Sequence, residues 1–498
     1  MTIETVRIQL EPLSAVVEVP RGASLVSALS AHGVEFPCGG TGICGGCRVR
    51  VMAGSVAVRD PDLLVFSRKE LDDGWRLACQ ARAETPLVLE CGQWHMDVLT
   101  DNSNLLSTGK SGLGIAIDLG TTTIAAQMID LATGEVHAIE TNLNPQASFG
   151  SDVMSRIRAT LSGADLTTVV RAALCQMIAN LAGGREQEIV EVVLVGNTVM
   201  HHLFSGLDVE PLSHAPFQSA HLGVQCFHPC ELGWALPTNC RIRFERCLGG
   251  FVGSDILAGI VAVGMCHSED LLALIDLGTN GEIAIGNCHG IVCASTAAGP
   301  AFEAGSIRMG MRAVTGAISR VSLSENEMLA TVIGDVEAKG ICGSGLVDAV
   351  AMGLQSGRIL CSGRIADHTK LFSVKDPVVL FQSDIRELQL AKGAIASGFR
   401  LLLKRMGTNA NNLQRVYFAG AFGNYVQIES AIEIGLIEAP RERILAAGNT
   451  ALRGAKILLL SAVEPTLPAI EHVSLAADPG FQDELVESMA FPDVQISA

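Results

Sequence analysis

Aromatic residues are scarce in this sequence, at 4% of the chain, and charged residues make up only 17%. Hydrophobic residues nevertheless reach 48%, so the apolar mass is mostly aliphatic, and 52 glycines are mixed with it. This composition favours layered α/β packing with many tight turns. A chain of 498 residues is too long for one hydrophobic core, so we expect two to four domains.

A basic surplus and a long apolar run are also missing. The net charge of −17 argues against nucleic acid or an anionic membrane surface as partner. The nearest approach to a long apolar run, residues 256–266, is too short to span a bilayer. Residues 1–7 lack the charged-then-apolar pattern of a secretion signal. With 15 cysteines, the sequence therefore predicts a cytoplasmic protein whose thiols bind metal or lie buried.

Four cysteines near the N-terminus carry the first chemical signal. Cys38, Cys44 and Cys47 form a C-x5-C-x2-C pattern interleaved with glycines, and Cys79 follows in an Arg-Leu-Ala-Cys segment. This spacing is typical of a loop wrapped around a small iron–sulfur cluster. The glycines let the backbone bend tightly and turn N–H groups toward sulfur. Unlinked buried thiols and a zinc site are the alternatives, but zinc sites usually show two C-x2-C pairs and only one is present.

The residues around these cysteines predict a small β-rich domain with one helix. The expected strands and helix are residues 2–10, 15–19, 48–52 and 87–90, and residues 24–31. This arrangement resembles the β-grasp fold of plant- and adrenodoxin-type ferredoxins, over residues 1–92. The resemblance implies that Cys38, Cys44, Cys47 and Cys79 ligate a 2Fe-2S cluster.

Residues 93–112 are polar and are predicted to form a linker. They contain Gly109-Lys110-Ser111, which ends like a P-loop. A P-loop also needs a glycine five positions before its second one, and Asn104 stands there. We therefore reject this segment as a nucleotide site.

A buried strand that runs into an Asp-Leu-Gly-Thr turn occurs twice, at Asp118 and at Asp276. The glycine lets each turn approach a phosphate, and the hydroxyls and N–H groups can bind its oxygens. Each aspartate can hold water on Mg²⁺, which prefers carboxylates, waters and nucleotide phosphates together. Two such turns facing each other would clamp a polyphosphate. The expected phosphate contacts are Gly120, Thr121, Thr122, Thr123, Gly278, Thr279 and Asn280.

Two further glycine elements follow in the second half of the chain. Gly420 and Gly423 come after an apolar strand, where backbone could approach a base and ribose. Gly343 and Gly345 begin a helix, where small residues permit a close helix crossing that suits an interlobe hinge. An enzyme of another class with two plain β-turns is the alternative interpretation.

Together these motifs resemble the sugar kinase, heat-shock chaperone and actin superfamily, over about residues 113–460. The resemblance implies ATP, Mg²⁺ and two lobes, which we place at residues 113–270 and 271–498. It assigns Gly420 and Gly423 to adenosine and Gly343 and Gly345 to the connecting motif.

A ferredoxin module joined to an actin-like ATPase resembles one family, the ATP-dependent reductive activators of corrinoid proteins. The resemblance implies a one-electron transfer from the 2Fe-2S cluster to Co(II), giving Co(I), coupled to ATP. Its partners would be a corrinoid protein and an upstream low-potential electron donor, and a homodimer is left open. Asp118 and Asp276 would organise Mg²⁺ and the attacking water. Asn197, Asp255 and Glu303 are further polar candidates, with capping or surface contacts as their plainer roles.

Other functions fit parts of the same sequence. These are an ATP-driven activator of another low-potential enzyme, a small-molecule kinase with a regulatory redox domain, and an actin-like assembly protein. The dedicated ferredoxin module argues against the first, because such activators hold their cluster inside the ATPase domain. His201 and His202 are expected to pack or cap rather than bind cobalt. The cysteines Cys226, Cys230, Cys240 and Cys247 are too irregularly spaced to favour zinc.

Overall fold

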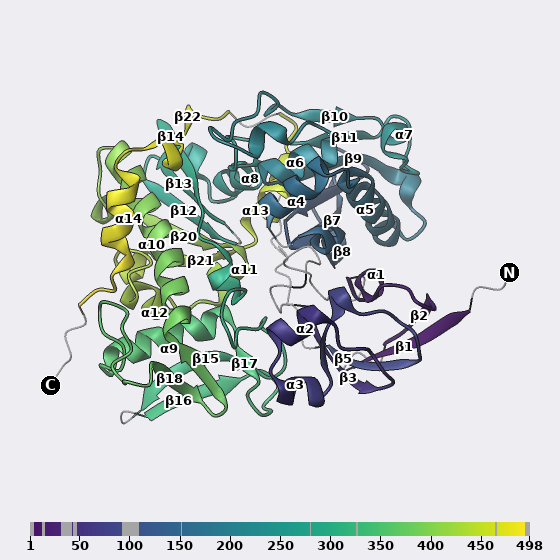
Figure 1. Ribbon diagram of the computed structural model, residues 1–498. Coiled ribbons are helices and arrows are strands. Elements are labelled where there is room, and N and C mark those ends of the chain that lie inside the picture. Colours follow the sequence, from purple (N-terminus) through teal and green to yellow (C-terminus); the bar gives the residue numbers. More distant parts are fainter. Residues whose placement is uncertain are drawn as a thin grey trace. The chain divides into compact units, whose positions relative to one another are not determined.

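The computed structural model describes residues 4–11, 15–30, 42, 47–91, 109–150, 152–278, 280–324, 327–463 and 466–493. The chain divides into two compact units, one of residues 1–96 with 143–173 and the other of residues 97–142 with 174–498. The elements of both are labelled in Figure 1. In the described part of the chain, no helix is both long and apolar enough to cross a membrane.

The N-terminal residues form a five-stranded sheet in the order β2-β1-β5-β3-β4. Its strands are β1 (Thr5–Glu11), β2 (Ala15–Pro20), β3 (Arg48–Ala53), β4 (Trp75–Leu77) and β5 (Leu87–Cys91). The central strands β1 and β5 run parallel, whereas β2 and β3 pair antiparallel to them. Helix α1 (Leu25–Ser30) contributes Leu25 and Leu29 to the core beneath the sheet. The predicted ferredoxin fold is confirmed.

Two short helices complete this part of the structure and were not predicted. They are α2 (Asp60–Val65) and α3 (Arg68–Asp72). The buried carboxylate of Asp62 accepts hydrogen bonds from the backbone N–H groups of Arg59, at 2.7 Å, and Leu77, at 2.8 Å. Asp62 therefore fixes α2 to the end of β4, beside Cys79. The same compact unit includes α4 (Val153–Leu161) and the start of α5 (Leu166–Ala182).

The second unit contains two six-stranded sheets built on one plan. In the first, β6 (Leu113–Leu119) pairs antiparallel with β7 (Thr123–Asp130) and parallel with β9 (Ile189–Gly196). In the second, β12 (Leu272–Leu277) pairs antiparallel with β13 (Gly281–Asn287) and parallel with β20 (Arg415–Ala419). The sequence repeat is therefore a structural repeat, as an actin-like fold requires.

The outer strands of both sheets extend this plan. The first sheet continues with β8 (Val136–Leu143), β11 (Arg241–Phe244) and β10 (Gln225–Phe227). The second continues with β14 (Gly290–Thr296), β21 (Ile444–Gly448) and β22 (Ile470–His472). Beyond the second sheet lie smaller sheets of β15 (Ala317–Ser324), β16 (Glu327–Val332) and β17 (Gly340–Ile341), and of β18 (Leu371–Lys375) with β19 (Val378–Phe381).

Two helices cross between the sheets, each packing on the sheet of the other half of the chain (Figure 1). Helix α8 (Ser254–Ala262) packs on the second sheet, and α13 (Thr450–Leu460) packs on the first. At their crossing, a Cβ on Gly454 would lie 2.0 Å from the carbonyl oxygen of Ala258, so only glycine allows the approach.

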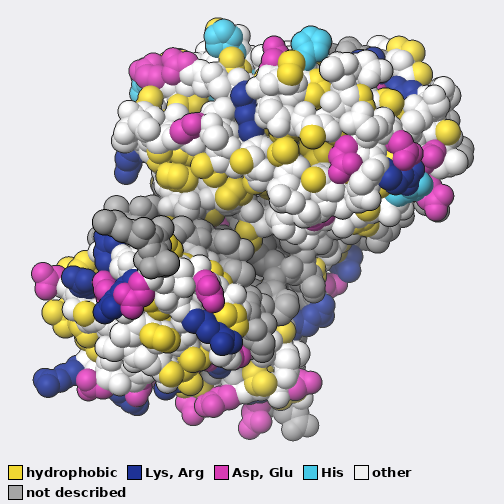
Figure 2. All heavy atoms as spheres, turned by 90° about the vertical axis from the view of Figure 1, so that its right-hand side faces the viewer, with side chains coloured by type: hydrophobic (Ala, Val, Ile, Leu, Met, Phe, Trp, Pro, Cys, Tyr) yellow, Lys and Arg dark blue, Asp and Glu magenta, His cyan; other side chains and the backbone are white. Residues whose placement is uncertain are grey.

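Seven further helices lie in the described part of the second unit. They are α6 (Thr198–Ser205), α7 (Pro229–Leu232), α9 (Gly343–Gln355), α10 (Gln382–Arg405), α11 (Gly420–Tyr425), α12 (Ile428–Glu433) and α14 (Phe481–Met489). On the face drawn in Figure 2, acidic and basic side chains are interspersed rather than segregated.

Candidate nucleotide and cluster sites

Asp118 and Asp276 occupy equivalent positions, each one residue before the end of its strand. Asp118 lies opposite Ala125 in β7 and Val195 in β9. Asp276 lies opposite Glu282 in β13 and Ala419 in β20. Each aspartate is thus held in the middle of a sheet, with neighbours on both sides, where its backbone cannot shift freely.

Asp118 and Asp276 share their surroundings with two further carboxylates, Asp255 and Glu282. Burial, followed by repulsion from Asp118, raises the pKa of Asp276 to about 7. Burial and repulsion from Asp276 raise the pKa of Asp255 to about 8. Burial raises the pKa of Asp118 to about 6, against a lowering hydrogen bond from Asn449. Burial, with repulsion from Asp255 and Asp276, also raises the pKa of Glu282 well above its ordinary value.

The two crossing helices begin at this carboxylate group. Asn449 caps α13, because its side-chain oxygen accepts a hydrogen bond from the Leu452 N–H at 2.8 Å. Its amide donates to Oδ2 of Asp118 at 2.9 Å. On the other side, Asp255 lies in the first turn of α8, where the helix dipole favours negative charge. One crossing helix therefore begins beside Asp118, and the other carries Asp255 in its first turn.

Asn197 lies at the matching end of β9. Its side-chain oxygen caps α6 by accepting from the Met200 N–H at 3.0 Å, and its amide donates to Oγ1 of Thr121 at 2.8 Å. The predicted candidate is thus in contact with the first Asp-Leu-Gly-Thr turn. Glu303, by contrast, is exposed at the end of a short 3-10 helix and is not among the residues that shift the pKa values of the four carboxylates.

The glycines of the predicted phosphate and adenosine turns lie close to these side chains. Gly420 follows β20 with a φ of +77°, and a Cβ there would lie 2.5 Å from Oδ1 of Asp276. Gly423 lies one turn further along α11. Gly120 and Gly278 follow β6 and β12, and Thr279 lies outside the described residues. Contact of these glycines with a nucleotide stays a prediction.

Gly343 and Gly345 make their close contacts within one half of the second unit, and their predicted hinge role stays a prediction. These glycines begin α9, but they abut the carbonyl oxygens of Phe302 and Ile318, which follow the second sheet in the chain. The close helix crossing between the sheets is formed by α8 and α13 instead. Small residues do permit a close approach, as the sequence indicated. The neighbour of these two glycines, however, is backbone from the same half of the unit, not a helix of the other half. Their part in ATP binding stays a prediction.

The structure describes two of the four predicted cluster ligands, Cys47 and Cys79. Cys47 directly precedes β3 and Cys79 follows β4, and these strands pair so that Arg48 lies opposite Leu77. The Ala78 N–H donates to the Cys47 carbonyl at 3.0 Å, which holds the two cysteines at one end of the sheet. Gln80 Nε2 lies 3.5 Å from the Cys79 sulfur as a donor. Cys38 and Cys44 lie outside the described residues. Two cysteines at one end of the sheet, one with a donor near its sulfur, fit an iron–sulfur cluster.

The remaining polar candidates, His201, His202 and Lys110, contact other groups of the protein. His202 contacts the Thr198 carbonyl at 2.8 Å and the Ser219 hydroxyl at 2.7 Å, and His201 contacts the Gly223 carbonyl at 3.2 Å. Both rings are buried, as expected for packing residues. Lys110 pairs with the buried Glu191 at 2.9 Å, which agrees with rejecting it as a P-loop lysine.

The cysteines between 226 and 247 do not assemble into a metal site. Cys226 and Cys230 are exposed, whereas Cys240 and Cys247 are buried. Burial raises the pKa of both buried thiols to about 12. In the described part of the chain, they join no group of three metal-binding side chains.

Sequence reasoning missed Asn449 and gave Glu282 no role. Asn449 had a signal, because an Asn-Thr pair before an apolar run marks a helix start. Nothing in the sequence, however, links that helix start to Asp118.

The fold and the two sites define an iron–sulfur protein with an actin-like ATPase domain. The model of the 2Fe-2S iron-sulfur cluster binding domain matches residues 8–84. The RACo middle region matches residues 113–268, and the C-terminal domain of RACo, the ASKHA domain, matches residues 270–498. The N-terminal domain accordingly carries a 2Fe-2S cluster and the C-terminal domain binds ATP. The predicted linker and lobe boundaries stay predictions.

Relatives that match most of the chain agree with these domain matches. The corrinoid activation enzyme RamQ of Eubacterium limosum is 35% identical over 425 residues, which cover 76% of this chain and 70% of that protein. The reductase of the Co(II) methylated amine-specific corrinoid protein from Methanosarcina barkeri is 28% identical over 385 residues, 70% of each chain. A solved structure of a reductive activator for corrinoid, iron-sulfur protein matches with a TM-score of 0.65 at 27% identity and covers 98% of both chains. The chain belongs to the family of reductive activators of corrinoid proteins.

Proposed function

We propose that this protein restores a corrinoid protein to its active state by delivering one electron to Co(II), giving Co(I), in a reaction coupled to ATP. One observation carries the proposal: a 2Fe-2S domain and a doubled aspartate site lie in one chain that belongs to the corrinoid-activator family. Reductive activation of a corrinoid protein is the activity of that family. The electron path, the coupling and the residue roles are what we add.

Cys38, Cys44, Cys47 and Cys79 would hold the cluster. When bound, the cluster supplies a one-electron donor, and plant-type clusters have potentials near about −400 mV. The chain contributes the sulfur ligands and the donor group of Gln80 beside Cys79, since hydrogen bonds to sulfur tune the potential. An upstream low-potential protein or reductant must supply the electron, and a cytoplasmic location would keep these thiols reduced.

The carboxylate group would bind Mg²⁺ with the phosphates of ATP. Four carboxylates with raised pKa values lie together, and a hard divalent ion is the chemical match for oxygen ligands. Bound Mg²⁺ would offset the charge of the phosphates. Asp118 and Asp276 would hold it through water, and Asp255 would orient the attacking water. Gly120 to Thr123 and Gly278 to Asn280 would cradle the phosphates, with Gly420 and Gly423 toward adenosine.

ATP is needed because the electron transfer is uphill. A gap of about 200 mV corresponds to about 4–5 kcal/mol for one electron. The crossing helices α8 and α13 begin at the carboxylate group, so a nucleotide that draws Asp118 and Asp276 together would move both halves of the unit. Such a closure would shift a docked corrinoid protein toward the state that accepts the electron.

The partner dependence of ATP hydrolysis tests this proposal. We expect the rate of phosphate release to rise when a Co(II) corrinoid protein is added, and to stay low with the Co(I) form or with simple sugars. Phosphate transferred to a small molecule, with no effect of any corrinoid protein, would favour a kinase instead. Size-exclusion chromatography with light scattering in the same samples would show whether the protein is a homodimer.

A further inference from the structure

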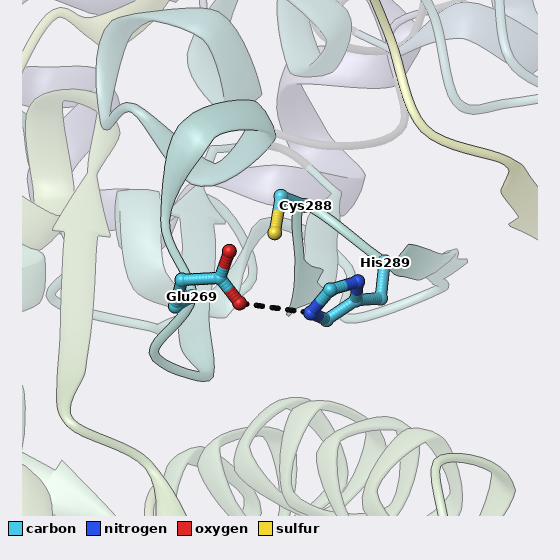
Figure 3. Close-up of side chains that lie close together, drawn as sticks. All are labelled: Glu269, Cys288 and His289. Atoms are coloured by element: carbon cyan, nitrogen blue, oxygen red, sulfur yellow. Dashed lines mark hydrogen bonds and ion pairs between the residues drawn. The ribbon is translucent and has the colours of Figure 1, made fainter.

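A second group of metal-binding side chains lies on the second sheet, away from the carboxylates. Cys288 and His289 form the two-residue turn between β13 and β14, where Asn287 lies opposite Gly290. Glu269 lies in the loop before β12. The ligand atoms of Glu269, Cys288 and His289 all lie within 4.8 Å of one another. Figure 3 shows the Cys288 sulfur and the His289 ring both directed toward the Glu269 carboxylate.

Backbone hydrogen bonds fix the two segments together before any ion binds. The Cys288 N–H donates to the Ser268 carbonyl at 2.9 Å. The Asn287 amide donates to the Glu269 carbonyl at 3.1 Å, and its side-chain oxygen accepts from the His289 N–H at 3.0 Å. The three side chains thus project from a closed hairpin and a loop tied to it. Such preorganisation lowers the cost of bringing ligands together.

The distances between the ligand atoms suit a metal ion with tetrahedral coordination. His289 Nε2 lies 2.9 Å from Glu269 Oε2. Two nitrogen or oxygen ligands at about 2.0–2.1 Å from tetrahedral zinc lie about 3.3 Å apart. The distance between His289 Nε2 and Glu269 Oε2 therefore needs to lengthen only slightly for both atoms to bind the ion. The side chains of His289 and Glu269 are 71% and 81% exposed, so they can adjust and an ion can reach them. An exposed pair of this kind contributes little to stability, so metal binding can break it with little loss.

We propose that Glu269, Cys288 and His289 form a surface zinc site with a fourth position open to water. One thiolate, one imidazole and one carboxylate are zinc ligands, and three protein ligands leave the fourth place free. The hard ion Mg²⁺ prefers oxygen ligands, so the two sites select different metals.

The zinc site is distinct from the proposed nucleotide site although they share a strand. Strand β13 begins beside Glu282 in the carboxylate group and ends at the turn that carries Cys288. At about 3.4 Å per residue, the two ends are roughly 20 Å apart. Zinc at the turn therefore leaves the phosphate contacts untouched.

Zinc binding by the intact protein with its cluster tests the proposal. Under anaerobic conditions, we expect equilibrium dialysis against buffered Zn²⁺ to give one zinc per chain beside the cluster iron, unaffected by excess Mg²⁺. Cys288→Ser and His289→Ala should each weaken zinc binding at least about tenfold, and Glu269→Gln should weaken it less. Cys226→Ser and His228→Ala, which change an exposed thiol and an exposed imidazole elsewhere, should bind zinc as the unchanged protein does.

X-ray absorption at the zinc edge identifies the atoms bound to zinc without interference from the cluster iron. We expect one sulfur at about 2.3 Å and lighter ligands at about 2.0 Å. Four sulfurs would mean that zinc had replaced iron in the ferredoxin domain, and no sulfur would mean adventitious binding. Either spectrum, or a failure of the unchanged protein to bind zinc, would overturn the proposal.

Discussion

The side-chain amide of Asn449 donates a hydrogen bond to Oδ2 of Asp118 at 2.9 Å, although 331 positions separate the two residues in the chain. The same side chain caps α13 through the Leu452 N–H. Asn449 therefore joins the helix that crosses between the sheets to the first aspartate of the proposed nucleotide site.

The two roles of Asn449 can be separated by substitution. Serine is as good a helix cap as asparagine but is too short to reach Asp118, so Asn449→Ser should lower ATP turnover about tenfold with little loss of stability. Asn449→Ala should in addition lower the free energy of unfolding by about 1 kcal/mol. Steady-state ATPase assays and urea unfolding measure the two effects. Asn409→Ala, at an exposed 3-10 helix cap, is the control that should retain turnover. Full turnover in Asn449→Ser would show that Asp118 needs no such partner.

Asp255→Asn should separate stability from activity. Since the folded-state pKa values of Asp118, Asp255 and Asp276 are raised, their ionised forms destabilise the metal-free fold at a pH above those values. That cost disappears as the pH falls toward the ordinary carboxyl range. The variant should therefore melt roughly 2–4 °C or more higher than the unchanged protein at pH 8 without metal, and the gain should shrink at pH 5.

The same Asp255→Asn variant should lose most MgATP turnover if Asp255 orients water. Asp270→Asn removes an exposed carboxylate outside the group and should change neither property. Calorimetric melting and phosphate release measure both proteins. A variant that is destabilised at pH 8 would contradict the proposed charge repulsion.

Cys79→Ala should remove the visible absorbance of the cluster and the reducing activity while leaving ATP affinity within about twofold. The reason is that Cys79 and the carboxylate group belong to separate compact units. Cys361→Ala, at an exposed thiol, should keep both properties. Absorbance after anaerobic reconstitution and nucleotide titration are the measurements. A loss of ATP binding in Cys79→Ala would show that the cluster supports the nucleotide site.

Lys110→Met tests whether the Gly-Lys-Ser segment binds nucleotide. The buried Glu191 accepts ion pairs from Lys110 at 2.9 Å, Arg241 at 3.0 Å and Arg243 at 2.8 Å. Removing one cation should cost about 1–3 kcal/mol of unfolding free energy and leave ATP affinity unchanged. Glu191→Gln should cost more, because it leaves the cations without their buried partner. A tenfold loss of ATP affinity in a stable Lys110→Met protein would restore the P-loop interpretation.

Because His201 is buried, we expect the folded protein to lose stability in acid. Burial, with repulsion from His202, lowers the pKa of His201 to about 4 from an ordinary 6.5. Protonation therefore favours the unfolded chain: the stability is fully present above about pH 6.5 and is lost as the pH falls through about 4. Between pH 7.5 and pH 5 this one group should cost roughly 2 kcal/mol.

Urea unfolding at these two pH values measures the loss. His201→Gln, which does not titrate, should lose correspondingly less stability than the unchanged protein over this interval. His228→Gln replaces an exposed histidine and should keep the full loss. Equal pH dependence in all three proteins would show that His201 is not the titrating group.

The sequence predicted the parts of the structure that local patterns encode. The turn after β6 and the turn after β12 are recognisable because glycine and threonine must follow a buried strand there. The ferredoxin strands were found from alternation, whereas the three-residue β4 was too short to show it.

Contacts that depend on the packing of distant segments could not be predicted in this way. Gly454 against Ala258, and Asn449 against Asp118, join residues that no local pattern relates. The glycines of α9 have the same local signature as Gly454 but a different neighbour, and their hinge role stays a prediction. The predicted cysteine ligands Cys38 and Cys44 stay predictions because they lie outside the described residues.

The most direct test follows the cobalt itself. The reduced protein is mixed anaerobically with a Co(II) corrinoid protein, and the Co(I) absorbance is recorded with MgATP, with a non-hydrolysable analogue and without nucleotide. We expect Co(I) to accumulate only when nucleotide is present, and the analogue shows whether binding suffices. Equal Co(I) formation with and without nucleotide, or none with any corrinoid partner, would contradict the proposed coupling.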